Sequence, residues 1–312
     1  MTRIAALFPG QGSQFVGMGH ELAKNFRAAE AVFDRVNEAL DFPLSKLCWE
    51  GPAEELQMTE KTQPALLTHS IAAWEILKQE GLEVDGFAGH SLGEYSAITA
   101  AGGLSLEDAA QTVRLRGRLM QEAVPAGQGA MAAVLGLEDG VVVSICEHIS
   151  DGKTEVVAAV NFNAPGQVVI AGSTKAVDTA IEKLKEAGAR RALPLPVSAP
   201  FHSPLMAPAR EGLTPTLQSL DFHGLSQPLY RNVDASPVTS PKDLCEGLIR
   251  QVDAPVLWSE TIRKMIDDGF DTFIEIGAGK VLSGLVKRIH RPETCYQAGS
   301  PDEIQTLLEN LD

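Results

Sequence analysis

Apolar and polar positions in the first 125 residues follow two different periods. Residues 4–8 form an unbroken apolar run that ends at a Pro-Gly pair, which is typical of a buried strand. Apolar residues then recur at spacings of three and four over 22–40, which predicts one amphipathic helix. Two further helices are expected, one beginning near Pro64 and one over 106–123, with a short strand at 86–88 between them. This alternation predicts an α/β domain with a mostly parallel sheet.

The pattern changes at the Pro-Ala-Gly-Gln-Gly segment over 125–129. The positions after it predict the order strand, helix, strand, strand, helix, strand, over 130–135, 140–149, 155–162, 167–171, 175–187 and 191–195. This βαββαβ order is that of a ferredoxin-like domain. We therefore expect a ferredoxin-like small domain over 126–197, inserted into a larger α/β domain made of 1–125 and 198–312. That larger domain has a further core strand near its end, at 271–276.

The charge and cysteine content narrow the possible functions. The chain has 26 Lys and Arg against 41 Asp and Glu, a formal net charge of −15, so we expect no binding to nucleic acid or membrane surfaces. The four cysteines are far apart and no His cluster has metal-ligand spacing, so we expect reduced thiols and no metal site. The first apolar run is too short for a signal peptide, and no stretch approaches the ~18 apolar residues of a membrane span. A cytoplasmic protein is therefore expected.

A Gly-x-Ser-x-Gly sequence over 89–93 makes Ser91 a candidate nucleophile. In this motif a sharp turn between a strand and a helix lifts the serine hydroxyl to the rim of a sheet. Backbone N–H groups at the start of that helix can stabilise an oxyanion. A plain glycine-bounded turn gives the same pattern. The strand-like residues before the motif and the helix-compatible residues after it favour the catalytic interpretation.

His202 is the candidate base for this serine, because four prolines between positions 194 and 204 hold its segment in an extended loop. No acidic residue flanks it, so we expect a Ser–His dyad whose imidazole is oriented by a backbone or amide oxygen. A histidine that only solvates a proline-rich loop is the alternative. The Gly-Gln-Gly-Ser-Gln segment over 10–14 could supply a second oxyanion donor, since its glycines let the backbone approach a ligand closely.

Arg116 is a further candidate because its helical neighbours three and four positions away, Val113, Leu119 and Met120, are apolar. A guanidinium on the apolar side of a helix is costly unless it is paired, and its planar fork fits a carboxylate. The carboxylate could belong to a ligand or to a core Asp or Glu in a structural ion pair. The residues alone leave these two possibilities equally open.

Five segments form a set: FPGQGSQ over 8–14, TQPAL over 62–66, GHSLGEY over 89–95, RGRLMQ over 116–121 and PFHS over 200–203. As a set they closely resemble the malonyl-CoA:acyl-carrier-protein transacylases of bacterial fatty-acid synthesis. The resemblance covers nearly the whole chain, in the order and spacing of that family. It implies a hydrolase-like large domain and a ferredoxin-like small domain, with the active site in the cleft between them.

The resemblance implies a role for each candidate residue. Ser91 would be the acylated nucleophile, His202 its base, and Arg116 the clamp on the malonyl carboxylate. The backbone N–H groups of Gln11 and Leu92 would form the oxyanion hole. The chemistry implied is ping-pong transfer of a malonyl group from malonyl-CoA to the phosphopantetheine thiol of acyl carrier protein, through a malonyl-serine intermediate.

Further positions follow from the same resemblance. An oxygen of Gln251 would orient the histidine, and Gln63, Asn161 and Phe201 would bind substrate. An aromatic residue at the position of Phe201 is similar to that of malonyl-selective members, where it crowds an α-methyl group. The chain departs from the family at Ala278, where relatives often carry proline, and this affects no catalytic position.

We expect no cofactor, because malonyl-CoA is a substrate and the phosphopantetheine belongs to the carrier protein, and we expect a monomer. Two alternatives stay open. A serine hydrolase or thioesterase would share Ser91 and His202 but would have no use for a carboxylate-binding Arg116. A non-catalytic relative that only binds the carrier would not need this intact set of residues. Both fatty-acid and polyketide synthesis use such a transfer.

Docking of the carrier protein, which is acidic in this family's pathway, needs a local exception to the net charge of −15. The closing helix expected over 281–290 buries an apolar stripe and leaves basic residues on its other face. These are Lys280, Lys287, Arg288 and Arg291. They are one candidate docking surface, and Arg190 and Arg191 of the small domain are a second. A solvated basic turn that complements the helix dipole is the alternative.

Overall fold

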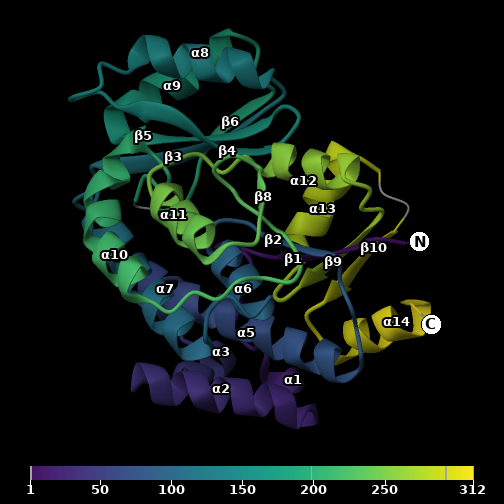
Figure 1. Ribbon diagram of the computed structural model, residues 1–312. Coiled ribbons are helices and arrows are strands. Elements are labelled where there is room, and N and C mark those ends of the chain that lie inside the picture. The colour runs from purple at the N-terminus through teal and green to yellow at the C-terminus, as the bar shows by residue number, and fades with distance from the viewer. Residues whose placement is uncertain (1, 198, 292–293, 312) are drawn as a thin grey trace.

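The structure is a computed structural model that describes residues 2–197, 199–291 and 294–311 (Figure 1). Its larger part is built on a six-stranded sheet. Its smaller part, at the top of Figure 1, is a four-stranded sheet covered by two helices. The expected fold class is confirmed, because the large sheet is mostly parallel and the small sheet is separate and antiparallel.

The strands of the large sheet run in the order β10-β9-β1-β2-β7-β8. Their bounds are Thr294–Ala298 (β10), Thr272–Ile276 (β9), Ile4–Phe8 (β1), Gly86–Gly89 (β2), Leu229–Tyr230 (β7) and Pro237–Val238 (β8). Residues 5–8 of β1 are completely buried between neighbouring strands and helices, which explains their unbroken apolar run. In the parallel β1–β2 pair Phe8 lies opposite Gly89. The segments that follow these two strands therefore begin side by side.

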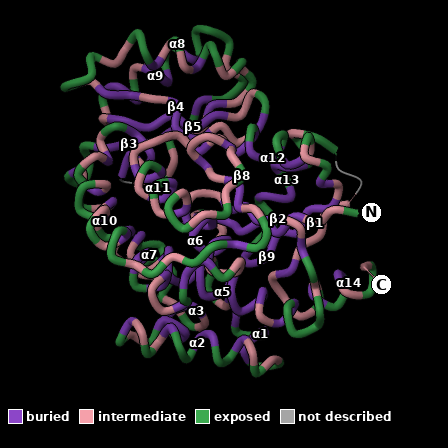
Figure 2. Tube along the Cα trace, in the orientation of Figure 1, coloured by how far each residue is buried: buried purple, intermediate pink, exposed green. Residues whose placement is uncertain are grey.

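Different helices cover the two faces of this sheet. The helices outside the small part are α1 (His20–Asn25), α2 (Arg27–Leu40), α3 (Leu44–Glu50), α4 (Ala53–Leu56), α5 (Thr59–Gln79), α6 (Leu92–Ala100), α7 (Leu106–Glu122), the 3₁₀ turn η1 (Pro204–Met206), α10 (Ala207–Ser219), α11 (Pro241–Gln251), α12 (Trp258–Asp267), α13 (Val281–Ile289) and α14 (Pro301–Leu311). Ala6 and Phe8 of β1 belong to the hydrophobic core shared with α2, α5, α6 and α7, and α5 is buried along most of its length (Figure 2). Ala5 and Leu7 belong to the core shared with α12 and α13. Successive residues of β1 thus serve opposite faces, as the pleat of a strand requires.

Two expectations about helices are wrong. The single helix expected over 22–40 is two helices, because Phe26 between them is extended, with φ −130° and ψ 119°. Its apolar spacing continues through the break since α1 and α2 pack on the same core. At the break, the Asn25 side chain donates to the backbone oxygen of Glu21, a bond that competes with the helical ladder. The helix expected to begin near Pro64 begins at Thr59, and the proline near its start removes only one backbone donor.

The small part consists of β3 (Gly129–Leu135), α8 (Asp139–Ile149), β4 (Val157–Ala164), β5 (Gln167–Ser173), α9 (Thr174–Glu186) and β6 (Arg191–Pro194). Its strand order, β4-β5-β3-β6, is that of a ferredoxin-like sheet. These elements lie within the domain expected over 126–197. The chain of the large part touches this sheet where Val256 donates to the backbone oxygen of Val160 at 2.8 Å and accepts from Phe162 N at 2.9 Å.

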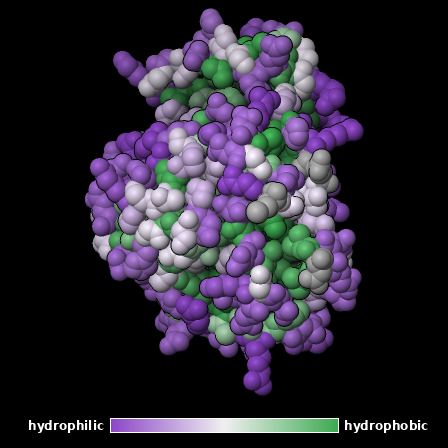
Figure 3. All heavy atoms as spheres, turned by 45° about the vertical axis from the view of Figure 1, so that its right-hand side comes forward, coloured by the Kyte–Doolittle hydropathy of each residue, from purple (hydrophilic) through white to green (hydrophobic). Residues whose placement is uncertain are grey.

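The surface is mostly polar on the face that Figure 3 shows, where hydrophobic residues appear in scattered areas among hydrophilic ones. Within the described ranges, no helix has the length and apolar character needed to cross a bilayer.

Candidate active site

Ser91 lies at the sharp turn between β2 and α6, with φ 52° and ψ −106°. A positive φ is strained for a residue with a side chain, and such strain is typical of a nucleophile held at the top of a sheet. Glycine is required on both sides of this turn. A Cβ at Gly89 would lie 1.9 Å from the backbone oxygen of Gly93, and a Cβ at Gly93 would lie 2.0 Å from that of Phe8. Gly89 therefore lets the end of β2 approach the start of α6, and Gly93 lets the start of α6 pack directly on β1.

His202 meets the serine hydroxyl. Its Nε2 lies 2.7 Å from Ser91 Oγ, and its Nδ1 lies 2.9 Å from the backbone oxygen of Gln251. A carbonyl oxygen only accepts, so Nδ1 carries the ring proton and Nε2 is free to accept the proton of the hydroxyl. Burial, and to a lesser degree the charge of Arg116, lowers the pKa of His202 to about 3. The imidazole is therefore neutral at neutral pH and can act as a base.

Arg116 reaches the same hydroxyl from α7 and is 1% exposed. Its Nη2 donates to Ser91 Oγ at 3.2 Å and to Gln251 Oε1 at 2.9 Å, and its Nη1 donates to Gln63 Oε1 at 2.9 Å. No ion pair within the described ranges involves this guanidinium, so the structural ion pair considered from the sequence is absent there. A buried cation whose hydrogen-bond partners are all neutral can bind an anionic ligand next to the nucleophile.

Two backbone N–H groups are available for an oxyanion. Leu92 is the first residue of α6, and Gln11 follows β1. Neither N–H has a hydrogen-bond partner in the part of the chain that the structure describes. The parallel pairing of β1 with β2 brings both segments to the same edge of the sheet, where His90 N also donates to the backbone oxygen of Phe8 at 3.0 Å. The donors thus lie at the carboxyl ends of strands, where α/β folds place their sites.

These residues share one cavity of about 340 Å³ between the large sheet and the small one. The expected site residues that line it are Gln11, Gln63, Ser91, Leu92, Arg116, Asn161, Phe201 and His202. Gln251 lies outside the lining and contacts Arg116 and His202. The side-chain oxygen of Asn161, on β4, is buried and has no hydrogen-bond partner in the described ranges. The structure therefore brings together residues that are up to 240 positions apart in the sequence.

Comparison with known proteins shows the family of this chain. Residues 6–304 match the family model of the acyl transferase domain. The chain is 49% identical to the malonyl CoA-acyl carrier protein transacylase of Bacillus subtilis, over 100% of this chain and 98% of the relative. The chain belongs to the malonyl-CoA:acyl-carrier-protein transacylase family. It is therefore an acyltransferase, as the motifs predicted.

Solved structures of the family have the same fold. The acyl-carrier-protein S-malonyltransferase of Bartonella henselae has a TM-score of 0.96 and 43% identity, and the match covers 99% of each chain. A malonyl-transacylase solved in complex with a type II PKS acyl-carrier protein has a TM-score of 0.96 and 42% identity, over 99% of this chain and 100% of the other.

Sequence reasoning missed two polar residues beneath this transacylase site. Asn232, which follows β7, accepts from Ser91 N at 2.7 Å and donates to the backbone oxygen of Gly89 at 2.7 Å. Nothing in the sequence pointed to it, since it lies 141 positions from Ser91. Glu94 is 1% exposed. The sequence did carry a signal for Glu94, which is the one charged residue in the apolar segment over 92–100.

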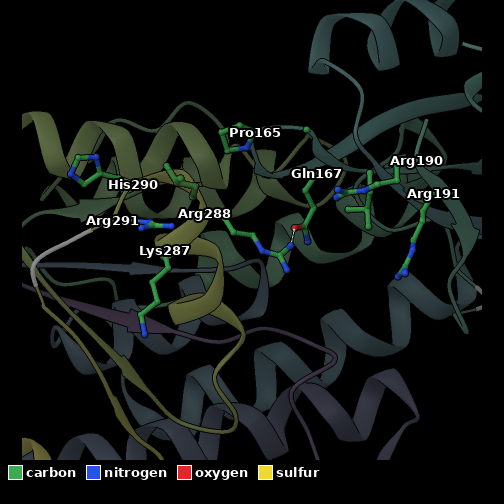
Figure 4. A pocket seen from close by; sticks show the side chains of 11 residues that line it. Pro165, Gln167, Arg190, Arg191, Lys287, Arg288, His290 and Arg291 are labelled. Carbon is green, nitrogen blue, oxygen red and sulfur yellow. Dashed lines mark hydrogen bonds between the residues drawn. The ribbon is translucent and has the colours of Figure 1, made fainter. Parts of the chain in front are cut away.

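A second and larger cavity of about 980 Å³ adjoins the first, and Gln167 lines both. Among the residues that the structure describes, it is lined mainly by basic side chains of β6, α13 and the segments beside them, and by no acidic one (Figure 4). The basic residues of the lining are Arg190, Arg191, Lys287, Arg288, His290 and Arg291. Arg288 donates to Gln167 Oε1 across it (Figure 4). We call this cavity the basic groove. It unites the two basic surfaces considered from the sequence, except that Lys280 does not line it.

Proposed function

We propose that this enzyme transfers the malonyl group of malonyl-CoA to the phosphopantetheine thiol of acyl carrier protein, supplying extender units for fatty-acid synthesis. The observation that carries this proposal is that a base and a cation both contact the hydroxyl oxygen of Ser91. Ser91 Oγ lies 2.7 Å from the base, His202 Nε2, and 3.2 Å from a cation, Arg116 Nη2. A serine hydrolase needs the first contact alone. A buried guanidinium beside the nucleophile favours an acyl group with a carboxylate at its far end.

In the first half of the proposed reaction, His202 Nε2 takes the proton of Ser91 as Oγ attacks the thioester carbonyl carbon. The N–H groups of Gln11 and Leu92 stabilise the tetrahedral oxyanion. The carbon–sulfur bond then breaks, His202 returns the proton to the departing sulfur, and CoA leaves as a thiol. The product is malonyl-Ser91, whose carboxylate is held by Arg116.

In the second half, the carrier's phosphopantetheine thiol gives its proton to His202 Nε2 and attacks the ester carbonyl carbon. The same two N–H groups hold the second oxyanion. The bond to Ser91 Oγ breaks, and His202 returns the proton to that oxygen. Every group in these steps belongs to the chain or to a substrate, so we propose that the enzyme uses no cofactor. We further propose that it works as a monomer in the cytoplasm, since this chain itself supplies the nucleophile, the base, the cation and both oxyanion donors.

Intact mass spectrometry tests the covalent intermediate. Incubation with malonyl-CoA should add one malonyl mass to the protein, and Ser91→Ala should abolish the addition. His202→Ala should slow the acylation by about 10²–10⁴, the usual contribution of a general base. Label that persists in Ser91→Ala would refute the assignment. Release of the label by water as fast as by holo carrier protein would identify a thioesterase instead.

We propose that the acidic carrier docks on the basic groove. Support comes from its charge and from Gln167, which places the groove beside the cavity that holds Ser91. Reversing the charges of α13 and its end with Lys287→Glu, Arg288→Glu and Arg291→Glu should raise the KM for the carrier and weaken its salt dependence. A second combination, Arg190→Glu with Arg191→Glu, should do the same from the opposite wall. Charge reversal at Lys242 and Lys264, which lie outside the groove, is the control, and an equal effect there would refute docking at the groove.

A further inference from the structure

A buried carboxylate lies directly beneath the reactive groups. Glu94 is in the first turn of α6, three positions after Ser91, and is 1% exposed. Its Oε2 accepts from Gln251 Nε2 at 2.9 Å and from the backbone N of Asn232 at 3.0 Å. Its Oε1 has no hydrogen-bond partner in the described part of the chain. Burying a carboxylate is costly, and this one has only neutral donors, so ordinary packing does not account for it.

Gln251 connects this carboxylate to the base and to the cation. Its backbone oxygen accepts from His202 Nδ1, and its side-chain Oε1 accepts from Arg116 Nη2, each at 2.9 Å. Its Nε2 donates to the backbone oxygen of Ser91 at 2.9 Å, in addition to Glu94 Oε2. Turning the amide by 180° would point its NH₂ at the donors of Arg116. It would also point its oxygen at a carboxylate, which when ionised only accepts. Glu94, the backbone oxygen of Ser91 and Arg116 therefore together fix which end of this amide faces Arg116.

Asn232 connects the same carboxylate oxygen to the nucleophile. Its backbone N donates to Glu94 Oε2, while its side chain accepts from Ser91 N and donates to the backbone oxygen of Gly89. The side chain thus bridges the two ends of the strained turn. One carboxylate oxygen therefore anchors both residues that hold the turn and the base in place.

We propose that Glu94 is a positioning residue for the acyl transfer proposed above, on which this inference rests. Its ionised carboxylate fixes Gln251 and Asn232. These two residues in turn hold the nucleophile, the base and the guanidinium in the reactive arrangement. Protonation of Glu94 weakens this constraint, because a neutral carboxyl accepts these two hydrogen bonds less strongly than a carboxylate does.

Several titratable and charged groups surround Glu94, and its burial places its titration near neutral pH. They are Tyr95, the next residue in the chain, His90, four positions before Glu94, Arg116 of α7, His202 before η1, Arg231 after β7 and Cys245 of α11. Burial raises the pKa of Glu94 to about 7, against the opposing effect of the two arginines. Burial lowers the pKa of both histidines, and raises that of Tyr95 and of Cys245. His202 therefore stays neutral between pH 5 and 8 while Glu94 changes its protonation state.

The test is the pH dependence of Ser91 malonylation, measured by rapid quench and intact mass between pH 5 and 8. A short malonyl thioester is used as the donor, since it carries no phosphate that titrates in this range. In the unmodified enzyme the rate of Ser91 malonylation should fall as the pH is lowered, with a midpoint near pH 7. We call this fall the acid limb. Glu94→Gln keeps the shape of the side chain and cannot ionise, so its rate at pH 8 should be at least tenfold lower and should not change with pH. A variant that keeps both the rate and the acid limb would overturn the proposal.

Matched variants separate positioning from stability. Glu275 is the other fully buried carboxylate in the described ranges, and it accepts from Leu282 N and Ser283 N. Glu275→Gln should lower the unfolding temperature and keep the acid limb. If Glu94→Gln fails to fold, Glu94→Asp, which keeps the charge, is the second variant. It should fold, malonylate Ser91 more slowly than the unmodified enzyme, and retain the acid limb. Loss of the acid limb in Glu94→Asp would also contradict the proposal. A malonyl label on the Ser91→Ala variant would instead refute the proposed acyl transfer through Ser91.

Discussion

Replacing Arg116 by alanine should change which acyl groups the enzyme accepts. The guanidinium is 1% exposed, next to Ser91 Oγ, and its hydrogen-bond partners are neutral oxygens of Gln63, Ser91 and Gln251. A malonyl carboxylate can accept hydrogen bonds from two N–H groups of this guanidinium, whose Nε has no hydrogen-bond partner in the described ranges. Hydrogen bonds to charged groups contribute about 1.5–3 kcal/mol each, so two contribute about 3–6 kcal/mol. At about 1.4 kcal/mol per factor of ten, Arg116→Ala should slow malonyl transfer by roughly 10²–10⁴.

An acetyl group has no carboxylate, and bound acetyl leaves the guanidinium without an anionic partner. Removing Arg116 should therefore spare or raise the rate of acetyl transfer. The assay is the rate of Ser91 acylation from malonyl-CoA and from acetyl-CoA, by rapid quench and intact mass. Arg118→Ala is the matched control, because Arg118 lies on the exposed side of the same helix. If Arg116→Ala lowers both rates equally, the arginine is structural and the clamp is refuted.

A folding measurement accompanies this assay. Arg116→Ala leaves Gln63 Oε1 and Gln251 Oε1 without their donor, at a cost of about 1–3 kcal/mol for each buried acceptor. Water entering the cavity offsets part of this cost. Thermal unfolding should therefore show a modest loss of stability in a variant that remains folded at the assay temperature.

Two further predictions concern stability and are measured by urea unfolding. Gly93→Ala should destabilise the protein by about 3 kcal/mol or more, since the new Cβ would lie 2.0 Å from a backbone oxygen. Gly140→Ala on α8 has open space around it and should stabilise the protein by about 0.4–1 kcal/mol. Equal effects of the two substitutions would contradict the close packing at Gly93. Burial lowers the pKa of His69 to about 4 and of His202 to about 3, from about 6.5 when unfolded, so the unfolded chain binds more protons below pH 6.5. Each histidine should therefore lower the free energy of unfolding by about 1.4 kcal/mol for each unit by which the pH falls below 6.5. His69→Asn should reduce this pH dependence. An unchanged slope between pH 6.5 and 5 in that variant would refute the prediction.

The local pattern of apolar and polar residues predicted the helices and strands that are buried on one face or on all sides. The strand over 4–8, the helix over 106–123 and the βαββαβ order after residue 129 agree with β1, α7 and the small sheet. Each of them has one buried face or lies wholly inside, so the apolar period shows the element directly. The pattern failed at Phe26, where two helices share one core and the apolar spacing runs through the break between them. It was also silent on β7 and β8, which are two residues each and too short to show a period.

The sequence by itself determined the chemistry available to this protein. Ser91 lies between two glycines that the sharp turn requires, and Arg116 lies among apolar neighbours, so a nucleophile and a buried cation could be named from neighbouring residues alone. Such features are local, because a turn or a helix face depends on residues within about four positions.

Only the tertiary structure decided how these groups are held. The partner of His202 is a backbone oxygen 49 positions away, and the partner of Ser91 N is the side chain of Asn232, 141 positions away. The basic groove joins residues near 190 with residues near 290. A hydrogen bond depends on the separation of two atoms to within a few tenths of an ångström, and between distant segments that separation is set by how sheets and helices pack. No period or motif in the sequence records it.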